Sequence, residues 1–537
     1  MLKPLNYHES GSLVVLWEHL GSPEPVGPNL RHVDLWRKRG TTVEGIAIER
    51  QGAIGLTLDA EHPQLVGTVM ASVNLFDILQ SKPLMGSTFL PEHGTSGRDN
   101  VAVLSYRLWR NEFHGDPAIV EKSVRLGDVP REVIGVMPEG FHFPNRNALK
   151  AFQSKQASSN VPEPAIFVPA VMDLTHHSWN ADYGNWVALA RLRPGIGSKE
   201  VQAELNGFDS QIVRDMPAQE RGEMRPDELF TSAQPMQEAI VGDSKTTLLL
   251  LMAAVLGLML IACLNLANAQ LARTLWRQRE ASMRAAPGAP KWRLVWNSLL
   301  ENLILALAGG VAGVALANAG LDLFRRNSTV DLPRLSEVHL DTTVLLFSIG
   351  ITVGATFLFS LLPAWSLLRT DPQAFLQQGG SRTVGNAMSR RPHRLLVGLQ
   401  VLGCTALLLI TGLFSKNLLD LRQRDKGFET EHVSFAQVNL SGKSYGPAAT
   451  RVAFIDGVLK NLRSIPGVQS AGIVSTMPLE GESWIERARR AERPDDMPSM
   501  INLRWTSPGY FEAMRYKLVA GRSFEKRDRG LTHLLHY

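Results

Sequence analysis

Two long uncharged stretches constrain this chain more than any other feature. Residues 248–264 carry no charged side chain, and residues 303–321 carry a single strongly polar one, Asn318. As helices rising about 1.5 Å per residue, each would cover roughly 25–30 Å, the thickness of the hydrocarbon core of a bilayer. Two further stretches, 344–368 and 395–413, repeat the pattern. We therefore expect four membrane spans; the alternative is a set of buried helices in a large soluble domain.

The charges of the connecting loops predict an orientation. Residues 273–293 hold six Lys or Arg and one acid, and residues 369–394 hold five Arg and one acid. Residues 325–341 balance three Arg against three acids. Positively charged loops stay in the cytoplasm, so the first two loops are expected inside and the third outside. Four spans would then place both flanks, residues 1–245 and 422–537, on the outer side.

Composition excludes several classes of protein. The net charge of +5 comes partly from the basic loops, and no basic stripe interleaves with aromatic residues, so nucleic-acid binding is not expected. Cys263 and Cys404 both lie inside predicted spans and form no disulfide framework. The first ten residues lack the apolar core of a signal peptide, although a large outer domain follows. We therefore expect either that this start is not the true one or that the chain is a fragment.

Both flanks are predicted to mix helices and strands. Alternation and turn residues predict strands in the first flank at 12–17, 45–48, 53–58, 65–72, 101–104, 124–126, 132–136 and 186–192. Apolar periodicity and capping residues predict helices at 30–39, 74–79, 106–113 and 199–213. In the second flank the same signals predict strands at 433–440 and 470–475 around a helix at 448–464.

The two flanks share a spaced motif. In the first, Ser72 is followed by Phe76, then Gly86 and Phe89; in the second, Ser507, Phe511, Gly521 and Phe524 follow at the same intervals. The recurrence indicates an internal duplication. A duplicated unit would begin with a span before the first flank and continue with further spans after the second. We therefore expect that both ends of the sequence are truncated.

At this point the chain resembles a known family. Residues 246–368 resemble the FtsX-like permease domain. The segments 101–109, 115–117 and 133–141 (Val-Ala-Val-Leu-Ser-Tyr-Arg-Leu-Trp, Gly-Asp-Pro and Val-Ile-Gly-Val-Met-Pro-Glu-Gly-Phe) resemble the MacB-like periplasmic core domain. The whole is similar to the duplicated ABC transporter permeases of acidobacteria.

The resemblance implies a fold class and domain limits. We expect an integral membrane α-helical protein of the FtsX-like type with mixed α+β periplasmic MacB-like core domains. The expected order is a core domain at 1–243, an FtsX-like domain at 244–370 with spans at 246–270, 297–323 and 344–368, a cytoplasmic loop at 371–393, a fourth span at 394–419 and an incomplete second core domain at 420–537. The expected location is the bacterial inner membrane.

The resemblance also implies a partner. Such permeases respond to an ABC ATPase that docks on the cytoplasmic side, and the matching motif here contains Arg279, Glu280, Arg284 and Gly288. Pro287 stands where the family has an aliphatic residue, and proline there would end or bend a helix. The open alternative for these charges is membrane topology alone. A homodimer, a periplasmic adaptor and membrane lipids are the other expected partners.

Polar residues inside the spans form a second candidate site. Asn265, Asn268, Asn318 and Gln400 could line a pathway, or could bond helix to helix within the bundle. Gly309, Gly310 and Gly313 predict close helix packing. The sequence suggests no catalytic residues, cofactor site or metal site: the one partial phosphate-loop pattern lacks its first glycine, and the histidine pairs lack acidic or cysteine partners.

These observations predict a non-enzymatic permease subunit. ATP hydrolysis by a separate ATPase would drive motion of the periplasmic domains and export of a small molecule, a peptide or a lipid-linked substrate. One alternative is a mechanotransmitter that activates a cell-wall hydrolase or releases lipoproteins without transport. Another is a non-functional gene fragment.

Overall fold

The computed structural model describes most of the chain in two compact units, residues 1–242 with 425–537, and residues 243–424. The residues outside the description are 1–4, 22–24, 58–63, 145–161, 173, 175–178, 180–185, 222–224, 226–227, 286–290, 328–341, 370–386, 430, 439, 441–444, 446, 479–483, 489–498 and 529–537.

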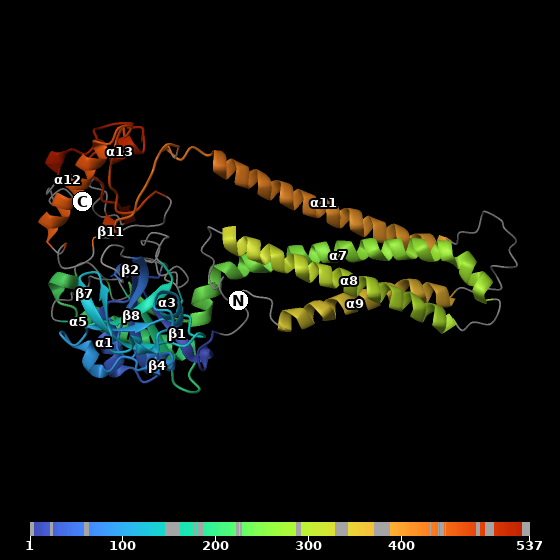
Figure 1. Cartoon of the computed structure of the whole chain (residues 1–537), viewed down its shortest axis with the longest axis horizontal. Helices are drawn as coiled ribbons and strands as arrows, with labels where there is room; N and C mark the ends of the chain where they lie inside the picture. Colours follow the sequence, from blue (N-terminus) through green and yellow to red (C-terminus); the bar gives the residue numbers. More distant parts are fainter. Residues whose placement is uncertain are drawn as a thin grey trace. The chain divides into compact units, whose positions relative to one another are not determined.

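A ten-stranded mixed sheet organises the described part of residues 1–242 (Figure 1). The order along it is β10-β1-β9-β2-β3-β8-β5-β7-β4, with β6 pairing to β2 and β7. Its strands are β1 (Leu13–Leu20), β2 (Val43–Thr57), β3 (Gln64–Ala71), β4 (Met85–Gly86), β5 (Val101–Leu104), β6 (Ser123–Leu126), β7 (Val129–Val136), β8 (Pro164–Pro169), β9 (Val187–Leu192) and β10 (Leu229–Pro235). The pairs β3–β8 and β5–β7 are parallel, and the others are antiparallel.

The centre of the sheet is buried on both faces. In β1, Leu13, Val15 and Trp17 enter one core while Val14 and Leu16 enter the other. A strand covered on both faces reads as a continuous apolar run, which explains the sequence Leu-Val-Val-Leu-Trp. The prediction of strand 12–17 is confirmed, and the structure extends it to Leu20.

Helices supply the cover on each face. On one face lie α1 (Leu30–Arg39) and α5 (Ser198–Asp215), whose Val33, Trp36, Val201 and Leu205 are buried against the sheet. On the other lies α2 (Leu75–Ile78), with the first turn of a longer helix described below. The remaining helices of the first unit are α3 (Tyr106–Glu112), α6 (Ala218–Arg221), α12 (Ala448–Arg463) and α13 (Tyr510–Ala513), with 3-10 turns at Ser10–Ser12, Pro91–Gly94, Pro117–Ile119 and Lys526–Asp528.

Local signals placed most of these elements correctly. Asn29 caps α1, its side chain accepting a hydrogen bond from the backbone N–H of Arg31 at 2.8 Å. Ser105 caps α3 in the same way, accepting from the N–H of Leu108 at 3.3 Å. The predicted hairpin turns at Gly127, whose φ of 57° suits glycine.

The spaced motif recurs as a three-dimensional unit. The hydroxyl of Ser72 accepts from the N–H of Ile48 at 3.0 Å, and the hydroxyl of Ser507 accepts from the N–H of Ile473 at 2.8 Å. In return, the N–H of Ser72 donates to the carbonyl oxygen of Ile48, and the N–H of Ser507 donates to the carbonyl oxygen of Ile473, both at 2.9 Å. Each serine therefore makes the same pair of hydrogen bonds with an isoleucine, just before the short helix that follows the serine.

The equivalence continues past the short helices α2 and α13. Gln80 and Arg515 end them with positive φ angles of 49° and 51°, which non-glycine residues rarely adopt. Gly86 and Gly521 follow with φ of 72° and 81°. A shared pattern of rare conformations supports the duplication inferred from the sequence.

The aromatic pair of each motif also matches. The rings of Phe76 and Phe89 lie 5.4 Å apart, and those of Phe511 and Phe524 lie 5.8 Å apart. The two copies differ in burial, because Phe89 is 5% exposed and Phe524 is 54% exposed.

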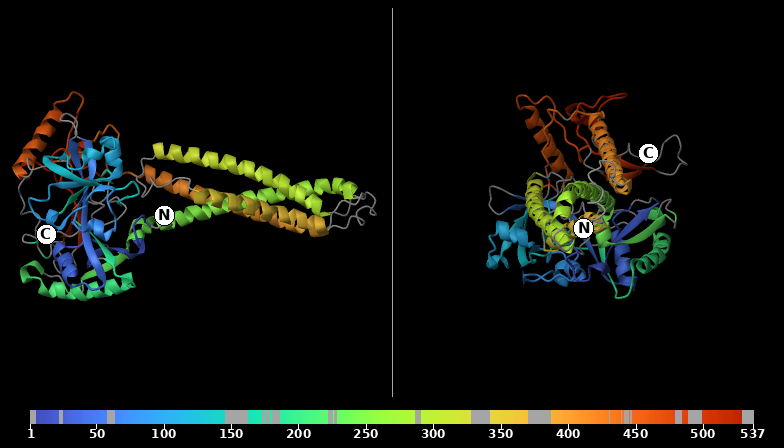
Figure 2. Two further views of the ribbon diagram at one scale, coloured as in Figure 1. Left: turned by 60° about the horizontal axis from the view of Figure 1, so that its bottom comes forward. Right: turned by 90° about the vertical axis from the view of Figure 1, so that its right-hand side faces the viewer.

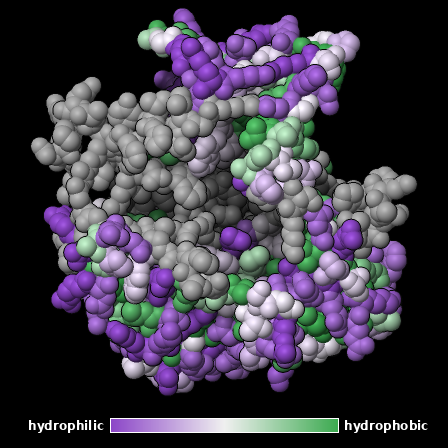
Figure 3. Space-filling view, turned by 90° about the vertical axis from the view of Figure 1, so that its left-hand side faces the viewer, coloured by the Kyte–Doolittle hydropathy of each residue, from purple (hydrophilic) through white to green (hydrophobic). Residues whose placement is uncertain are grey.

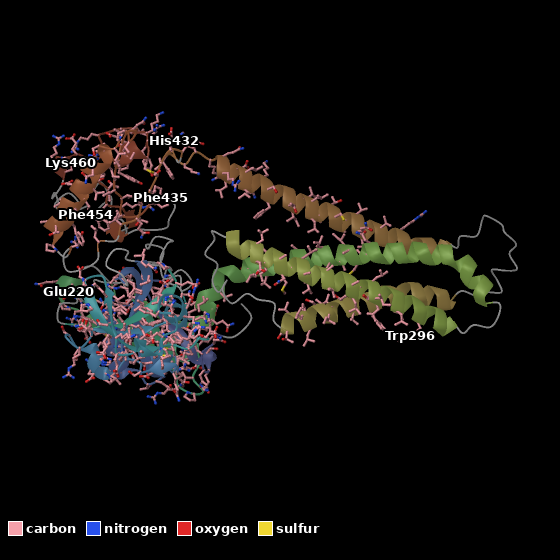
Figure 4. All side chains as sticks on the ribbon, in the orientation of Figure 1. Glu220, Trp296, His432, Phe435, Phe454 and Lys460 are labelled. Carbon is pink, nitrogen blue, oxygen red and sulfur yellow. The ribbon has the colours of Figure 1, made fainter. Side chains whose placement is uncertain are left out.

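Two strands predicted in the second flank are wrong. Residues 433–438 form no strand, and Phe435 is 69% exposed on the connection between helices α11 and α12 (Figure 4). In the predicted strand 470–475 only an isolated bridge forms, between Val474 and Thr506. Alternation alone does not make a strand, since the backbone needs a hydrogen-bonded neighbour. The described sheet here is β11 (Trp484–Ala488) with β12 (Ser499–Leu503).

The second unit contains four long helices, α7 (Met236–Ala285), α8 (Lys291–Asn327), α9 (Thr342–Arg369) and α11 (Ala387–Gln423) (Figure 2). Three are long and apolar enough to cross a membrane, at Leu248–Asn265, Leu303–Leu323 and Val397–Gln423. Among the residues that the structure describes, there are thus three candidate spans where four were predicted. In α9 the described apolar part, Thr342–Gly354, is shorter than the roughly 20 residues that a spanning helix needs.

Candidate functional site at the membrane helices

The first membrane helix begins inside the sheet domain. Helix α7 follows β10 directly, at Met236. Met236 and Ile240 are 0% and 1% exposed, and they belong to the same buried cluster as Phe76 and Phe167. The sequence prediction started this span at 246, whereas the helix begins at Met236. The spacing of the apolar residues Met236 and Ile240, one helical turn apart, could have predicted the earlier start of the helix.

The middle of α7 presents apolar side chains outward. Most side chains of Leu248–Asn265 are exposed, and those of Leu250 and Leu258 are 68% and 63% exposed, whereas Leu264 is buried. Hydrophilic side chains, by contrast, make up much of the described surface of the first unit seen in Figure 3. An apolar helix surface of this length is suited to lipid rather than water.

The predicted coupling residues lie on the last turns of the same helix. Arg279, Glu280 and Arg284 all fall within α7, which continues to Ala285. The connection predicted over 273–293 is helical over 273–285 and 291–293, and residues 286–290 lie between α7 and α8. Gly288 and Pro287 lie outside the described residues. Fifty helical residues correspond to about 75 Å of rise.

The predicted cytoplasmic loop 371–393 is also shorter than expected. Helix α9 ends at Arg369 and α11 begins at Ala387, so residues 387–393 are helical. The part of this prediction over 371–386 lies outside the described residues.

Small residues bring the helices together at two points. A Cβ placed on Gly310 of α8 would lie 3.7 Å from the side chain of Thr352 on α9. A Cβ on Gly403 of α11 would lie 3.3 Å from Ile261 on α7. The packing predicted for Gly310 is confirmed, whereas a Cβ on Gly309 or Gly313 would meet nothing within 4 Å. Small residues permit such close approach of helices in lipid.

Hydroxyl groups on α9 are satisfied by their own helix. Ser348, Thr352 and Thr356 donate to the carbonyl oxygens four residues earlier, at 2.8, 2.8 and 2.7 Å. This local bonding removes the cost of a free hydroxyl in hydrocarbon. An aromatic residue, Trp296, lies near the start of α8 before the apolar window (Figure 4), where interfacial tryptophans are common.

The predicted intramembrane polar residues do not form one cluster in the described part of the chain. Asn265 on α7 and Asn318 on α8 are exposed, so neither faces the interior of this single chain as the sequence interpretation expected. Gln400 on α11 is half-buried and interacts with another group. The backbone of Asn268 is helical, and its side chain lies outside the described residues. Among the described residues no group of three or more His, Cys, Asp or Glu could hold a metal ion.

Each of the two units contains a match to one family model. Residues 5–208 match the MacB-like periplasmic core domain, and residues 252–372 match the C-terminal domain of FtsX-like permeases. The chain carries both domains of the MacB/FtsX-like permeases. Members of this family work with ABC ATPases, which are separate or fused in its relatives, and the sequence prediction of this family is confirmed.

Curated relatives agree with this assignment. The macrolide export ATP-binding/permease protein MacB of Bdellovibrio bacteriovorus is 24% identical over 44% of this chain and 33% of its own length. The pyoverdine export ATP-binding/permease protein PvdT of Pseudomonas aeruginosa is 25% identical over 55% of this chain and 40% of its own length. The ABC transporter permease YknZ of Bacillus subtilis is 26% identical over 26% of this chain and 34% of its own length. The matches thus cover well under half of these proteins.

Solved structures with partial likeness come from the same group. The periplasmic region of MacB from Actinobacillus actinomycetemcomitans is 10% identical, covers 45% of this chain and 94% of that structure, and has a TM-score of 0.30. The extracellular domain of YknZ is 17% identical, covers 36% of this chain and 93% of that structure, and has a TM-score of 0.26.

Proposed function

We propose that this chain is the permease subunit of an inner-membrane ABC transporter and that a separate ATPase moves its periplasmic sheet domain through α7. The observation that carries the proposal is the continuity of α7. One helix starts among the buried residues Met236 and Ile240, passes through the candidate span Leu248–Asn265, and ends after Arg279, Glu280 and Arg284. A helix without a break can transmit displacement along its axis.

Charge supports docking of the ATPase at the far end of α7. The last turns hold Arg279 and Arg284, with Glu280 between them, and the basic residues Lys291 and Arg293 open α8. We propose that Arg279, Glu280 and Arg284 contact the ATPase and that Gly288 belongs to the same motif. The relatives named for macrolide and pyoverdine export suggest a small molecule as the exported substrate.

Two further parts of the architecture are proposed on the same basis. We take α9 as a fourth span, because its 28 helical residues exceed the length needed to cross a bilayer. Four spans return residues 425–537 to the periplasmic side, where the repeated serine and aromatic motif supports a second core domain.

Exposed Asn265 and Asn318 need polar partners in lipid, which favours a homodimer. A periplasmic adaptor would complete an export path.

Charge reversal at the end of α7 tests the coupling role. We expect Arg284→Glu to reduce the ABC ATPase that co-purifies with the tagged chain by about tenfold, because a charge-assisted contact becomes repulsive. The measurement is quantitative mass spectrometry of nucleotide-binding-domain peptides after affinity purification from solubilised membranes.

The matched control is Arg326→Glu, near the other end of α8, which should leave ATPase recovery unchanged. Membrane levels of both variants are compared first, so that a folding defect is recognised. Undiminished ATPase recovery with Arg284→Glu would mean that the loop charges serve topology alone.

A further inference from the structure

A set of ionisable side chains is sealed between α5 and the sheet. Glu18 of β1, His32 of α1 and Asp209 of α5 are 0%, 0% and 1% exposed. Burial of several titratable groups in one place is costly unless each is bonded or neutral. Their hydrogen bonds therefore decide which of them carries a charge.

Both oxygens of Glu18 are occupied. Oε1 lies 2.7 Å from Nδ1 of His32, and Oε2 accepts a hydrogen bond from the backbone N–H of Asn29 at 3.1 Å. Asn29 is the cap of α1, so these bonds fix the start of that helix against β1.

Asp209 is only half-satisfied. Its Oδ1 accepts a hydrogen bond from the hydroxyl of Thr231 on β10 at 2.8 Å, whereas its buried Oδ2 has no hydrogen-bond partner. Asn206, one turn earlier on α5, accepts from the N–H of Thr231 at 3.2 Å. An ionised carboxylate with a bare buried oxygen is unfavourable, whereas a protonated carboxyl carries no charge and needs fewer hydrogen-bond donors around it.

A second acid on the same helix provides an internal comparison. Glu204 accepts hydrogen bonds from the backbone and hydroxyl groups of both Thr41 and Thr42, including one of 2.7 Å from the N–H of Thr41. Burial raises the pKa of Glu204, but these four bonds outweigh it and lower the pKa. Burial and the charge of Glu18 raise the pKa of Asp209 to about 7, against the opposing bonds from Thr231.

We propose that Asp209 is a proton-binding switch, protonated in acidic surroundings and ionised in alkaline ones, whose ionisation weakens the attachment of α5 to β10. The facing ionisable groups in the described part of the chain are Glu18 on β1 and His32 on α1, and β10 contributes the hydroxyl and N–H of Thr231. β10 leads directly into α7 at Met236, five residues after Thr231. The switch is a property of the sheet domain and does not depend on the proposed transport.

The sign of the effect follows from proton linkage. The folded state binds a proton that the unfolded chain releases between about pH 4 and about pH 7, so Asp209 stabilises the fold most at the acidic end. This contribution is lost as the pH rises through about 7.

The test is thermal unfolding of the full chain in detergent, from about pH 5.5 to about pH 8.5. We expect the melting temperature of the sheet domain to fall by on the order of 5 °C over this range. Asp209→Asn mimics the protonated acid and should remove this fall, melting at or above the unmodified chain at the alkaline end. Asp215→Asn, an exposed acid on the same helix, is the matched control and should keep the fall.

A second variant tests the proposal even if Asp209→Asn fails to fold. Thr231→Val removes the hydroxyl that favours the ionised form, so the midpoint of the pH-dependent fall should move to higher pH. The same pH dependence in the unmodified chain and in Asp209→Asn would overturn the proposal. So would a midpoint that Thr231→Val leaves in place.

Discussion

Phe167→Ala should destabilise the sheet domain by about 3–5 kcal/mol, because it removes a fully buried aromatic ring and leaves a cavity. Phe167 lies on β8 and is 1% exposed. Its ring centroid is 5.4 Å from that of Phe76 and 5.7 Å from those of Phe141 and Phe143. The measurement is the free energy of unfolding of the domain in urea, with the slope of the transition compared between variants.

Phe167→Leu is the matched variant, because it keeps most of the apolar volume. It should cost less than about 1.5 kcal/mol. If Phe167→Ala also cost less than that, the aromatic cluster would not be the packed centre that the structure describes.

Ile240→Ala should destabilise the same domain by about 2–5 kcal/mol, even though the residue belongs to the first membrane helix. Ile240 is 1% exposed and shares a cluster with Phe76 and Phe167, so its loss opens a cavity in the sheet domain. The measurement is again the unfolding free energy, together with the protease sensitivity of the domain in membranes.

Glu238→Ala, in the same turn of α7 but on its exposed side, should change stability by no more than about 0.5 kcal/mol. Equal effects of the two substitutions would show that the start of α7 is not anchored in the domain core.

The membrane helices could be predicted because an uncharged stretch of this length can adopt few other structures. Their limits could not. The run Val241-Gly-Asp-Ser-Lys-Thr-Thr has the composition of a loop, but it lies between a buried helical turn and an apolar span, and it continues the helix. Cooperative helix propagation from both sides outweighs the weak propensities of these residues.

In the sheet domain, local elements were more predictable than their pairing. The limits of α1 follow from the cap at Asn29 and the apolar spacing of Leu30, Val33 and Trp36. Nothing local places β9 between β1 and β2, since that arrangement depends on partners far apart in sequence. The strands β8 and β10 were missed because β8 is bounded by prolines and β10 contains polar residues.

The buried acid cluster was also missed, although β1 held a hint. Glu18 is an acidic residue in a mostly apolar strand that is covered on both faces. Such a residue needs a buried partner, but only the fold reveals that His32 contacts Glu18 and that the charge of Glu18 acts on Asp209.

The most direct test of the account is the sidedness of α7. In a chain carrying Cys263→Ala and Cys404→Ala, single cysteines are introduced by Asp116→Cys in the sheet domain and by Arg284→Cys at the end of α7. A membrane-impermeant maleimide added to cells with a permeable outer envelope should label Asp116→Cys at once and Arg284→Cys only after the inner membrane is opened. Labelling of both positions from the same side would contradict the account, because α7 would then not carry motion across the membrane.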